Sequence, residues 1–509
     1  MTAAIIAGAR HLTGDEVDER VQRGVAGLAN LGVREGDVVA VMLRNDPAFL
    51  EAMLIARQAG CYGCPINWHY KADEVGFILR DSAAAALVVH ADLLAQIKDG
   101  LPPDLPLLVV APSAELQSAF KLDPAQCRVP ADALEWESWL AASSPYAGSE
   151  HAPRLALYYS SGTTGRPKGI RREALDAALA AGVAATLRAA YGVAPGMRTA
   201  MVAPLYHSAP ASYGVQSMLA GELMIIHPRL DPEALLADIE RHQLTHLYLV
   251  PTHYVRLLRL PDAVKRRYDL RSLRFIASTG SPCPADVKRA MIDWWGPILN
   301  EGYACSELGF LTACSSADAL AKPGTAGKAL PHVDIRILDD DGHALPLGVP
   351  GLIYARNRAY PDFSYLNRAE ARHEMERDGL MTVGDVGYFD ADGYLFVCDR
   401  KADMVISGGV NIYPAEIEAV LITMPGVADC AVFGIPDAEF GESLAAHIQP
   451  ATHAAIETDD VHTFLRARIA DYKVPRVIAF ADDLPREESG KIFKRKLREP
   501  YWREAGRRI

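Results

Sequence analysis

The sequence lacks the features that would direct a chain into or across a membrane. Residues 1–10 contain no cationic segment followed by a long apolar run, so we expect no secretory signal. The most apolar stretch, around residues 177–187, is too short to span a bilayer. It lies in an alanine-rich segment, residues 173–191, that we expect to form a helix. We therefore expect a soluble, cytoplasmic protein with no transmembrane segment.

A dominant basic cluster is also missing. The chain has 52 Lys and Arg against 64 Asp and Glu, which gives a net charge of −12, and no basic run stands out before the last twenty residues. Nucleic-acid binding depends on a clustered basic surface, so we expect no nucleic-acid partner.

The cysteines form no ordered set. All eight are scattered along the chain, which is typical of a reducing compartment. Cys61 and Cys64 make a single C-x-x-C, and no second pair matches it. We interpret these two as buried, inert thiols, although a redox pair or half of a zinc site stays open.

The composition of the sequence is typical of a globular protein with more than one domain. Half of the 509 residues are hydrophobic and under a quarter are charged, so we expect two or three domains. Segments with helical spacing (13–31 and 47–59) alternate with apolar runs of strand length (38–43 and 61–66). Such alternation predicts a parallel α/β sheet.

The pattern of predicted secondary structure changes twice towards the C-terminus. From about residue 334, short segments with Asp-Gly turns predict a small β-rich subdomain. After Arg400 a new α/β pattern begins. We predict an α/β protein with a large N-terminal domain (1–400) and a small, mobile C-terminal α+β domain (401–509), with a hinge near 400–402.

One stretch, residues 158–169, predicts a phosphate-binding loop. It combines four hydroxyl residues, three glycines and two cations, Arg166 and Lys168. Glycine lets backbone N–H groups approach an anion, hydroxyls add donors, and cations neutralise charge. It is not a Walker A loop, because Lys168 is followed by Gly169. Taken alone, a flexible polar surface loop stays open.

This stretch resembles the signature loop of the adenylate-forming superfamily. The superfamily includes acyl-CoA synthetases, aryl-CoA ligases, luciferases and the adenylation domains of peptide synthetases. Five further stretches resemble its motifs in the same order, and together they cover nearly the whole chain: 278–282, 300–307, 382–387, 401–418 and 484–495. The resemblance implies that a carboxylic acid reacts with ATP to give an acyl-adenylate, which CoA then converts to a thioester.

The resemblance also implies roles at the nucleotide. Tyr303 would lie against adenine, Ser306 near the phosphates, and Glu307 would coordinate Mg2+, a cation that prefers hard oxygen ligands. Asp385 would accept the ribose hydroxyls, since a carboxylate can take both donors of a vicinal diol, and Arg400 would also reach the ribose. Singly, each has an ordinary alternative as a turn or cap residue.

Two elements would face the acyl group. His207 matches a position beside the substrate carboxylate, although a lone histidine is more often structural. The segment 279–281 would meet adenine and wall the acyl tunnel.

The C-terminal motifs imply the remaining roles. Lys491 matches the catalytic lysine, whose mobile charge could bridge the carboxylate and the α-phosphate. We expect the basic residues that follow it to form a solvated tail: Lys494, Arg495, Lys496 and Arg498. The glycines at 408–409 would line the pantetheine tunnel, Phe440 would lie against the CoA adenine, and Lys473 near its phosphates. Ala402 departs from the Asp or Lys usual at the hinge.

These motifs predict an AMP-forming acid–thiol ligase. We expect ATP, Mg2+ and CoA as substrates and cofactors, and a medium- or long-chain fatty acid as the acid. An aryl-CoA ligase for benzoates or cinnamates, an enzyme that loads a carrier protein, and a nucleotide-binding protein without catalysis stay open, as does a homodimer. The predicted site residues are Lys491, His207, Glu307, Ser160, Ser161, Gly162, Thr163, Thr164, Gly165, Lys168, Thr279, Gly280, Ser281, Tyr303, Ser306, Asp385, Arg400, Gly408, Gly409, Phe440 and Lys473.

Overall fold

The computed structural model describes most of the chain. It covers residues 2–149, 151–160, 167–281, 283–407, 410–437, 439–451, 454–485 and 492–504. Within these ranges, no helix has both the length and the apolar character needed to cross a membrane.

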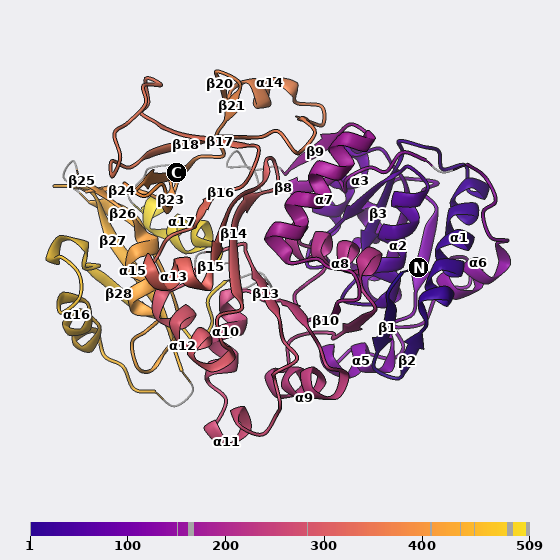
Figure 1. Cartoon of the computed structure of the whole chain (residues 1–509), viewed down its shortest axis with the longest axis horizontal. Coiled ribbons are helices and arrows are strands. Elements are labelled where there is room, and N and C mark those ends of the chain that lie inside the picture. The colour runs from indigo at the N-terminus through magenta and orange to yellow at the C-terminus, as the bar shows by residue number, and fades with distance from the viewer. Residues whose placement is uncertain are drawn as a thin grey trace.

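A five-stranded parallel sheet forms the first layer (Figure 1). Its order is β4-β3-β5-β6-β7, with β3 Val38–Met42, β4 Tyr62–Pro65, β5 Ala84–His90, β6 Leu107–Val110 and β7 Leu134–Glu135. All five residues of β3 are buried, as expected for a parallel strand packed on both faces. The helices α2 (Pro47–Gln58) and α3 (Ala72–Asp81) lie between these strands in the sequence. The predicted alternation of strand and helix is therefore confirmed here.

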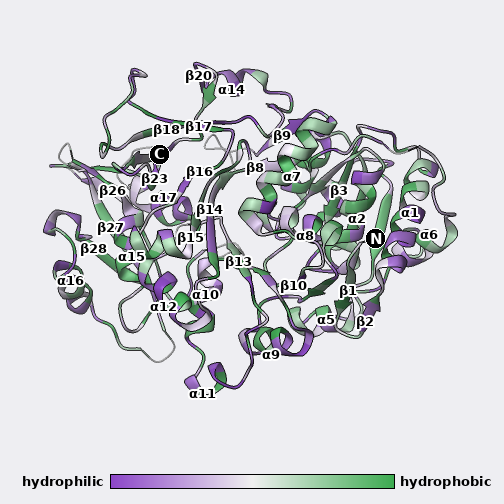
Figure 2. Ribbon diagram, viewed as in Figure 1, coloured by the Kyte–Doolittle hydropathy of each residue, from purple (hydrophilic) through white to green (hydrophobic). Residues whose placement is uncertain are grey.

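A nine-stranded sheet forms the second layer. Its order is β16-β15-β14-β13-β12-β10-β11-β1-β2, and the run from β14 to β1 is parallel. The bounds are β1 Ala4–Ala7, β2 Arg10–Leu12, β10 Arg198–Met201, β11 Leu223–Ile226, β12 His246–Tyr248, β13 Phe275–Ser278, β14 Leu299–Cys305, β15 Gly309–Ser315 and β16 Lys328–Ala329. Hydrophobic residues gather on the inner strands and on α2 and α7 (Ala177–Tyr191), as Figure 2 shows.

Two smaller sheets follow the parallel layers. A three-stranded sheet has the order β19-β9-β8, with β8 Tyr158–Ser160, β9 Lys168–Arg172 and β19 Phe363–Tyr365. A six-stranded sheet contains β17 Val333–Leu338, β18 Gly351–Asn357, β20 Glu376–Arg377, β21 Leu380–Met381, β22 Asp385–Phe389 and β23 Leu395–Arg400. The second matches the predicted β-rich segment that begins near residue 334.

The C-terminal part has its own sheet and its own core. Its strands are β24 Val405–Ser407, β25 Val410–Ile412, β26 Val427–Asp437, β27 Gly441–Pro450 and β28 Val477–Phe480, and its helices are α15 Pro414–Leu421, α16 Thr458–Arg466 and α17 Lys494–Glu504. A separate cluster of buried apolar side chains holds these elements together. Arg259 Nη2 donates to the carbonyl oxygen of Val427 at 3.1 Å, which joins this part to the large α/β region. The predicted fold class is confirmed.

Two local expectations can also be compared with the structure. Cys61 and Cys64 are buried, and burial raises the pKa of Cys61 to about 12, so both are the inert thiols that we expected. The alanine-rich helix, expected from residue 173, begins at Ala177, because the Asp176 side chain accepts from the Leu179 amide and caps it there.

Candidate active site

The residues predicted to face the acyl group lie at one edge of the nine-stranded sheet. His207 follows β10 and caps α8 (Ser208–Ala220), and residues 279–281 follow β13. Both strands are parallel neighbours of β12, so their carboxyl ends meet at the same edge. Ligands of open α/β sheets bind at such an edge.

A hydroxyl contact joins the acyl-side segment to the phosphate-side turn. The Oγ atoms of Ser208 and Ser306 lie 3.2 Å apart, although their residues are 98 positions apart in the sequence. His207, the neighbour of Ser208, is half-buried, and its ring centre lies 4.2 Å from that of Tyr206. The segment that carries His207 therefore contacts the turn that carries Ser306.

The residues predicted to contact adenine and ribose form a connected group. Tyr303 donates its hydroxyl hydrogen to Asp385 Oδ2 at 2.6 Å, and Arg400 Nε lies 3.4 Å from Asp385 Oδ1. Asp385 and Arg400 are register partners of β22 and β23, which explains why they meet. Burial, and next the Asp385 carboxylate, raise the pKa of Tyr303 well above its ordinary value, so Tyr303 stays a donor.

The predicted phosphate side has a similar group. Tyr365 donates its hydroxyl hydrogen to Glu307 Oε1 at 3.0 Å, and Lys168 Nζ lies 5.0 Å from the centre of the Tyr365 ring. Ser160 and Lys168 are register partners in the hairpin of β8 and β9. The rest of the predicted phosphate loop, residues 161–166, lies outside the described residues. Tyr365, which the sequence did not single out, is the partner of the predicted magnesium ligand.

Glu307 suits the magnesium ion that the sequence predicts. Its second carboxylate oxygen makes no hydrogen bond within the described part of the chain. Mg2+ takes hard oxygen ligands and often uses one or two carboxylates together with substrate phosphates. The free carboxylate oxygen therefore fits Mg2+, and Glu307 is the residue that would hold it.

The predicted CoA-side residues lie in the C-terminal part, and both contact charged neighbours. The Arg476 guanidinium carbon lies 4.6 Å from the centre of the Phe440 ring, and Nη1 of Arg476 is 2.9 Å from Asp437. Lys473 Nζ lies 2.7 Å from both carboxylate oxygens of Glu416. Arg476, three residues after Lys473, was not singled out from the sequence, and the structure places it against Phe440.

The remaining C-terminal predictions fall partly outside the structure. Lys491, Gly408 and Gly409 lie outside the described residues. The basic segment that follows was expected to be a solvated tail, which is correct for the exposed Arg495 and Lys496.

For Lys494 that expectation is wrong. Its Nζ lies 2.9 Å from Glu418 Oε1 and 3.0 Å from Oε2, and both side chains are about four-fifths buried. The segment does not extend into solvent, because α17 begins at Lys494 and packs against β26.

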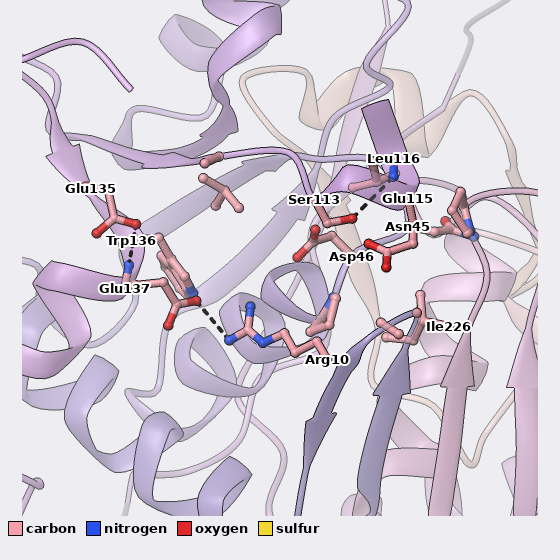
Figure 3. Close-up of a pocket in the computed structure, with 16 residues that line it drawn as sticks. Arg10, Asn45, Asp46, Ser113, Glu115, Leu116, Glu135, Trp136, Glu137 and Ile226 are labelled. Atoms are coloured by element: carbon pink, nitrogen blue, oxygen red, sulfur yellow. Dashed lines mark hydrogen bonds and ion pairs between the residues drawn. The ribbon is translucent and has the colours of Figure 1, made fainter. Parts of the chain in front are cut away.

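A separate cavity of about 150 Å3 lies between the two parallel sheets and contains none of the predicted site residues (Figure 3). Its polar groups already have partners. Glu137 pairs with Arg10 at 2.8 Å, Glu135 accepts from the Glu137 and Ser138 amides, and Glu115 accepts from the Ala9 amide. We therefore assign it no role in the reaction.

Comparisons with known proteins agree with this geometry. Residues 2–360 match the family model described as AMP-binding enzyme, and residues 416–491 match that of the AMP-binding enzyme C-terminal domain. A feruloyl-CoA synthase of Amycolatopsis sp is 34% identical over 98% of this chain and 96% of its own length. The long-chain-fatty-acid–CoA ligase FadD13 of Mycobacterium tuberculosis is 31% identical over 93% of this chain and 90% of its own. The anthranilate CoA ligase AuaEII in complex with anthranoyl-AMP superposes with a TM-score of 0.85 at 27% identity, covering 99% of this chain and 95% of its own.

The fold and the grouped nucleotide residues define an adenylate-forming enzyme. The chain belongs to the AMP-binding enzyme family, in which it is an AMP-forming acyl-CoA ligase with ATP and CoA as substrates. The resemblance found in the sequence motifs is thereby confirmed at the level of the family.

Proposed function

We propose that the chain activates an aromatic carboxylic acid of the benzoate or cinnamate type and transfers its acyl group to CoA. The sequence favoured a fatty acid and left the aromatic acid as its alternative. The observation that carries our preference for the aromatic acid is a cluster of four aromatic rings beneath the predicted acyl site.

The ring of Tyr191 is the centre of this cluster. Its centre lies 5.5 Å from the ring of Tyr213, 6.0 Å from that of Tyr248 and 4.8 Å from that of Phe310, each in an edge-to-face arrangement. All four side chains are at most 4% exposed. Rings in such arrangements pack densely and leave little room for a long alkyl chain.

The cluster contacts both segments that are predicted to face the acyl group. The Tyr191 hydroxyl donates to the carbonyl oxygen of Ala209 at 3.0 Å, in the first turn of the helix that His207 caps. The Tyr248 hydroxyl donates to the carbonyl oxygen of Thr279 at 3.4 Å. These bonds support a short pocket with an aromatic floor, which suits a flat, compact acid. The printed names of the feruloyl-CoA synthase and the anthranilate CoA ligase point the same way.

The reaction would proceed in two steps. In the first, a carboxylate oxygen bonds to the α-phosphorus of ATP and the bond to pyrophosphate breaks. In the second, the CoA sulfur bonds to the acyl carbon, the thiol proton is released, and AMP leaves. Mg2+ bound at Glu307 would offset the charge of the pyrophosphate.

The residues of this chain would divide the work between the two ends of ATP. Asp385 and Arg400 would hold the ribose, and Lys168 with the 161–166 loop would hold the phosphates. Lys491 would stabilise the charge that develops as the carboxylate attacks, because its ammonium is a mobile point charge on a long stem.

We propose a large domain (1–400) and a small domain (401–509) that rotate about a hinge near 400–402 between the two steps. Lys491 and Gly408–Gly409 both belong to the small domain, so one rotation could replace the lysine with the glycine turn at the site. A crosslink between the domains should stop one of the two steps. Both steps running at normal rates in the crosslinked protein would contradict the rotation.

The test of the substrate class is a panel of acids. Purified protein is incubated with ATP, Mg2+, CoA and either benzoate, anthranilate, cinnamate, ferulate, octanoate or palmitate, and pyrophosphate and thioester are measured separately. We expect kcat/KM for the best aromatic acid to exceed that for either fatty acid by at least about tenfold, since a poor fit in a pocket costs 1–3 kcal/mol. A preference for octanoate or palmitate would overturn the aromatic assignment.

Two variants test whether the activity in this panel depends on the predicted catalytic lysine. Lys491→Ala should lose acid-dependent pyrophosphate release, whereas Arg495→Ala, four residues away and exposed, should keep it. Release of pyrophosphate without thioester would instead favour a carrier protein as acceptor.

A further inference from the structure

The strand that leaves the phosphate loop ends in a buried arginine. Strand β9 begins at Lys168 and ends at Arg172, and the side chain of Arg172 is only 5% exposed. Its Nη2 donates to the carbonyl oxygen of Ser306 at 2.8 Å and to that of Glu307 at 2.5 Å. One guanidinium thus holds two consecutive carbonyl groups of the turn that carries the predicted magnesium ligand.

This arginine forms no close ion pair in the part of the chain that the structure describes. Among the residues that the structure describes, no carboxylate pairs with its guanidinium within 4.0 Å, and its Nε has no hydrogen bond. The nearby Glu307 carboxylate attracts it only over a longer distance. Burial lowers the pKa of Arg172, but an arginine stays protonated in proteins. Burying a charge without a close ion pair is costly, so a role in the fold alone explains Arg172 poorly. The attraction to Glu307 instead links Arg172 to the turn that it holds.

The neighbouring strand holds the other end of the same glutamate. Strand β19 pairs with β9, with Phe363 opposite Arg172 and Tyr365 opposite Ile170. Tyr365 donates its hydroxyl hydrogen to Glu307 Oε1, while Arg172 holds the backbone of Glu307. Two adjacent strands therefore fix both the main chain and the carboxylate of Glu307.

Strand β9 also carries Lys168, the lysine that is predicted to bind phosphate. Alternate residues of a strand share a face, so Lys168 and Arg172 lie on one side of β9, and Arg171 lies on the other. The strand thus sets the spacing between Lys168 and the Glu307 turn.

We propose that Arg172 is a positioning residue, which fixes the Ser306–Glu307 turn relative to Lys168 so that Mg2+ and the ATP phosphates bind together. The proposal rests on the proposed function, because it assumes that Glu307 binds the metal of Mg·ATP. Groups that orient a metal ligand in this way typically change metal affinity by about 10–100-fold when they are removed.

The test compares Arg172→Met with Arg171→Met, a control on the same strand whose side chain is exposed. ATP binding is measured by calorimetry with Mg2+ and with EDTA. For Arg172→Met we expect at least about tenfold weaker binding of Mg·ATP and no more than about a twofold change for metal-free ATP. Arg171→Met should match the wild type in both.

A second readout separates positioning from damage to the fold. The thioester step is started from synthetic cinnamoyl- or benzoyl-adenylate and CoA, which needs neither Mg2+ nor pyrophosphate. Arg172→Met should keep this step within about threefold of the wild type, because the phosphate side is not used. Equal Mg·ATP affinity in the two variants, or a parallel loss of both nucleotide forms and of the thioester step, would overturn the proposal.

Tyr365→Phe serves if Arg172→Met does not fold. It removes one hydroxyl group and should weaken Mg·ATP binding about threefold, with metal-free ATP binding unchanged. Unchanged Mg·ATP binding would count against the proposal that β9 and β19 position Glu307. The two proposals can fail separately. If the wild-type protein binds Mg·ATP but releases no pyrophosphate with any acid, the proposed function is contradicted. The role of Arg172 is then still decided by the Mg·ATP affinities of the variants.

Discussion

The two sides of the predicted active site use their charges differently. On the nucleotide side, Arg172 contacts backbone carbonyls, and Lys168 lies against the ring of Tyr365. On the CoA side, Lys473 contacts Glu416 and Arg476 contacts Asp437. Within the described residues, Lys168 and Arg172 of the first side pair with no carboxylate, although Arg400 pairs with Asp385, whereas Lys473 and Arg476 of the second side are both paired.

This difference suggests two modes of binding. The predicted nucleotide side would be preformed, since Tyr303 is already hydrogen-bonded to Asp385 and Tyr365 to Glu307. On the CoA side, the CoA phosphates would compete with Glu416 for Lys473. We therefore expect large effects of substitutions on the nucleotide side and small, salt-dependent effects on the CoA side.

The largest effect is expected at the ribose-binding group. Asp385→Ala removes the acceptor that Tyr303 and Arg400 share, and it should lower acid-dependent pyrophosphate release by about 10²–10³-fold. Calorimetry with ATP should show weaker binding as well. Asp392→Ala, in the exposed turn between the same two strands, is the control and should stay near wild type. Equal activity of the two variants would contradict a preformed ribose site.

The next effect concerns the fold of the C-terminal part. Lys494→Met leaves Glu418 without its cation in a mostly buried place, and should lower the free energy of unfolding by about 2 kcal/mol, less than for a fully buried pair. Chemical denaturation measures this loss. The exposed Lys496→Met should change the same free energy by less than about 0.5 kcal/mol.

The loss of unfolding free energy in Lys494→Met should depend on pH, and the pKa of Glu418 determines the direction. Burial raises the pKa of Glu418, so its protonated form is favoured in the folded state, and that contribution is present at low pH and is lost as the pH rises. Removing the Lys494 charge should raise this pKa further. The defect of Lys494→Met should therefore be smaller at pH 5 than at pH 8, and adding Glu418→Gln should remove the difference. An equal defect at both pH values would argue against the ion pair.

Lys494 also shows where prediction from sequence ends. The first helix was predictable because its signals are local: Thr13 and Glu16 form a capping box at its start. The burial of Lys494 depends on Glu418, which lies 76 positions away and belongs to another helix. A basic run gives no sign of such a partner.

The same distinction applies to the candidate site. Its loops could be located from glycines, hydroxyls and single carboxylates at known spacings. Which of these side chains meet could not, since Tyr303 and Asp385 are 82 positions apart and Arg172 and Glu307 are 135 apart. Arg172 in particular looks like an ordinary surface residue of an Arg-Arg pair until β9 is placed beside the Glu307 turn.

A smaller effect is expected from the hydroxyl group of Tyr303. Tyr303→Phe keeps the ring that is predicted to face adenine and removes only the bond to Asp385. ATP binding should become less favourable by about 1 kcal/mol, which raises Kd about fivefold. Tyr388→Phe, on the strand that carries Asp385, is the matched control. A loss as large as that of Asp385→Ala would mean that Tyr303 does more than orient the carboxylate.

The smallest effect would sharpen the contrast between the two sides. Glu416→Gln removes the anion that holds Lys473 and leaves the surrounding backbone unchanged. If Lys473 meets the CoA phosphates, KM for CoA should fall by about two- to threefold at low salt, since exposed ion pairs contribute less than about 1 kcal/mol. The gain should shrink in 0.5 M salt, about where screening removes interactions between exposed charges. Lys473→Ala should raise the same KM, and Glu439→Gln, an exposed carboxylate beside Phe440, is the control for a general change of charge. An equal gain in the Glu439 variant would show that the CoA side responds to net charge and that Glu416 does not compete specifically for Lys473.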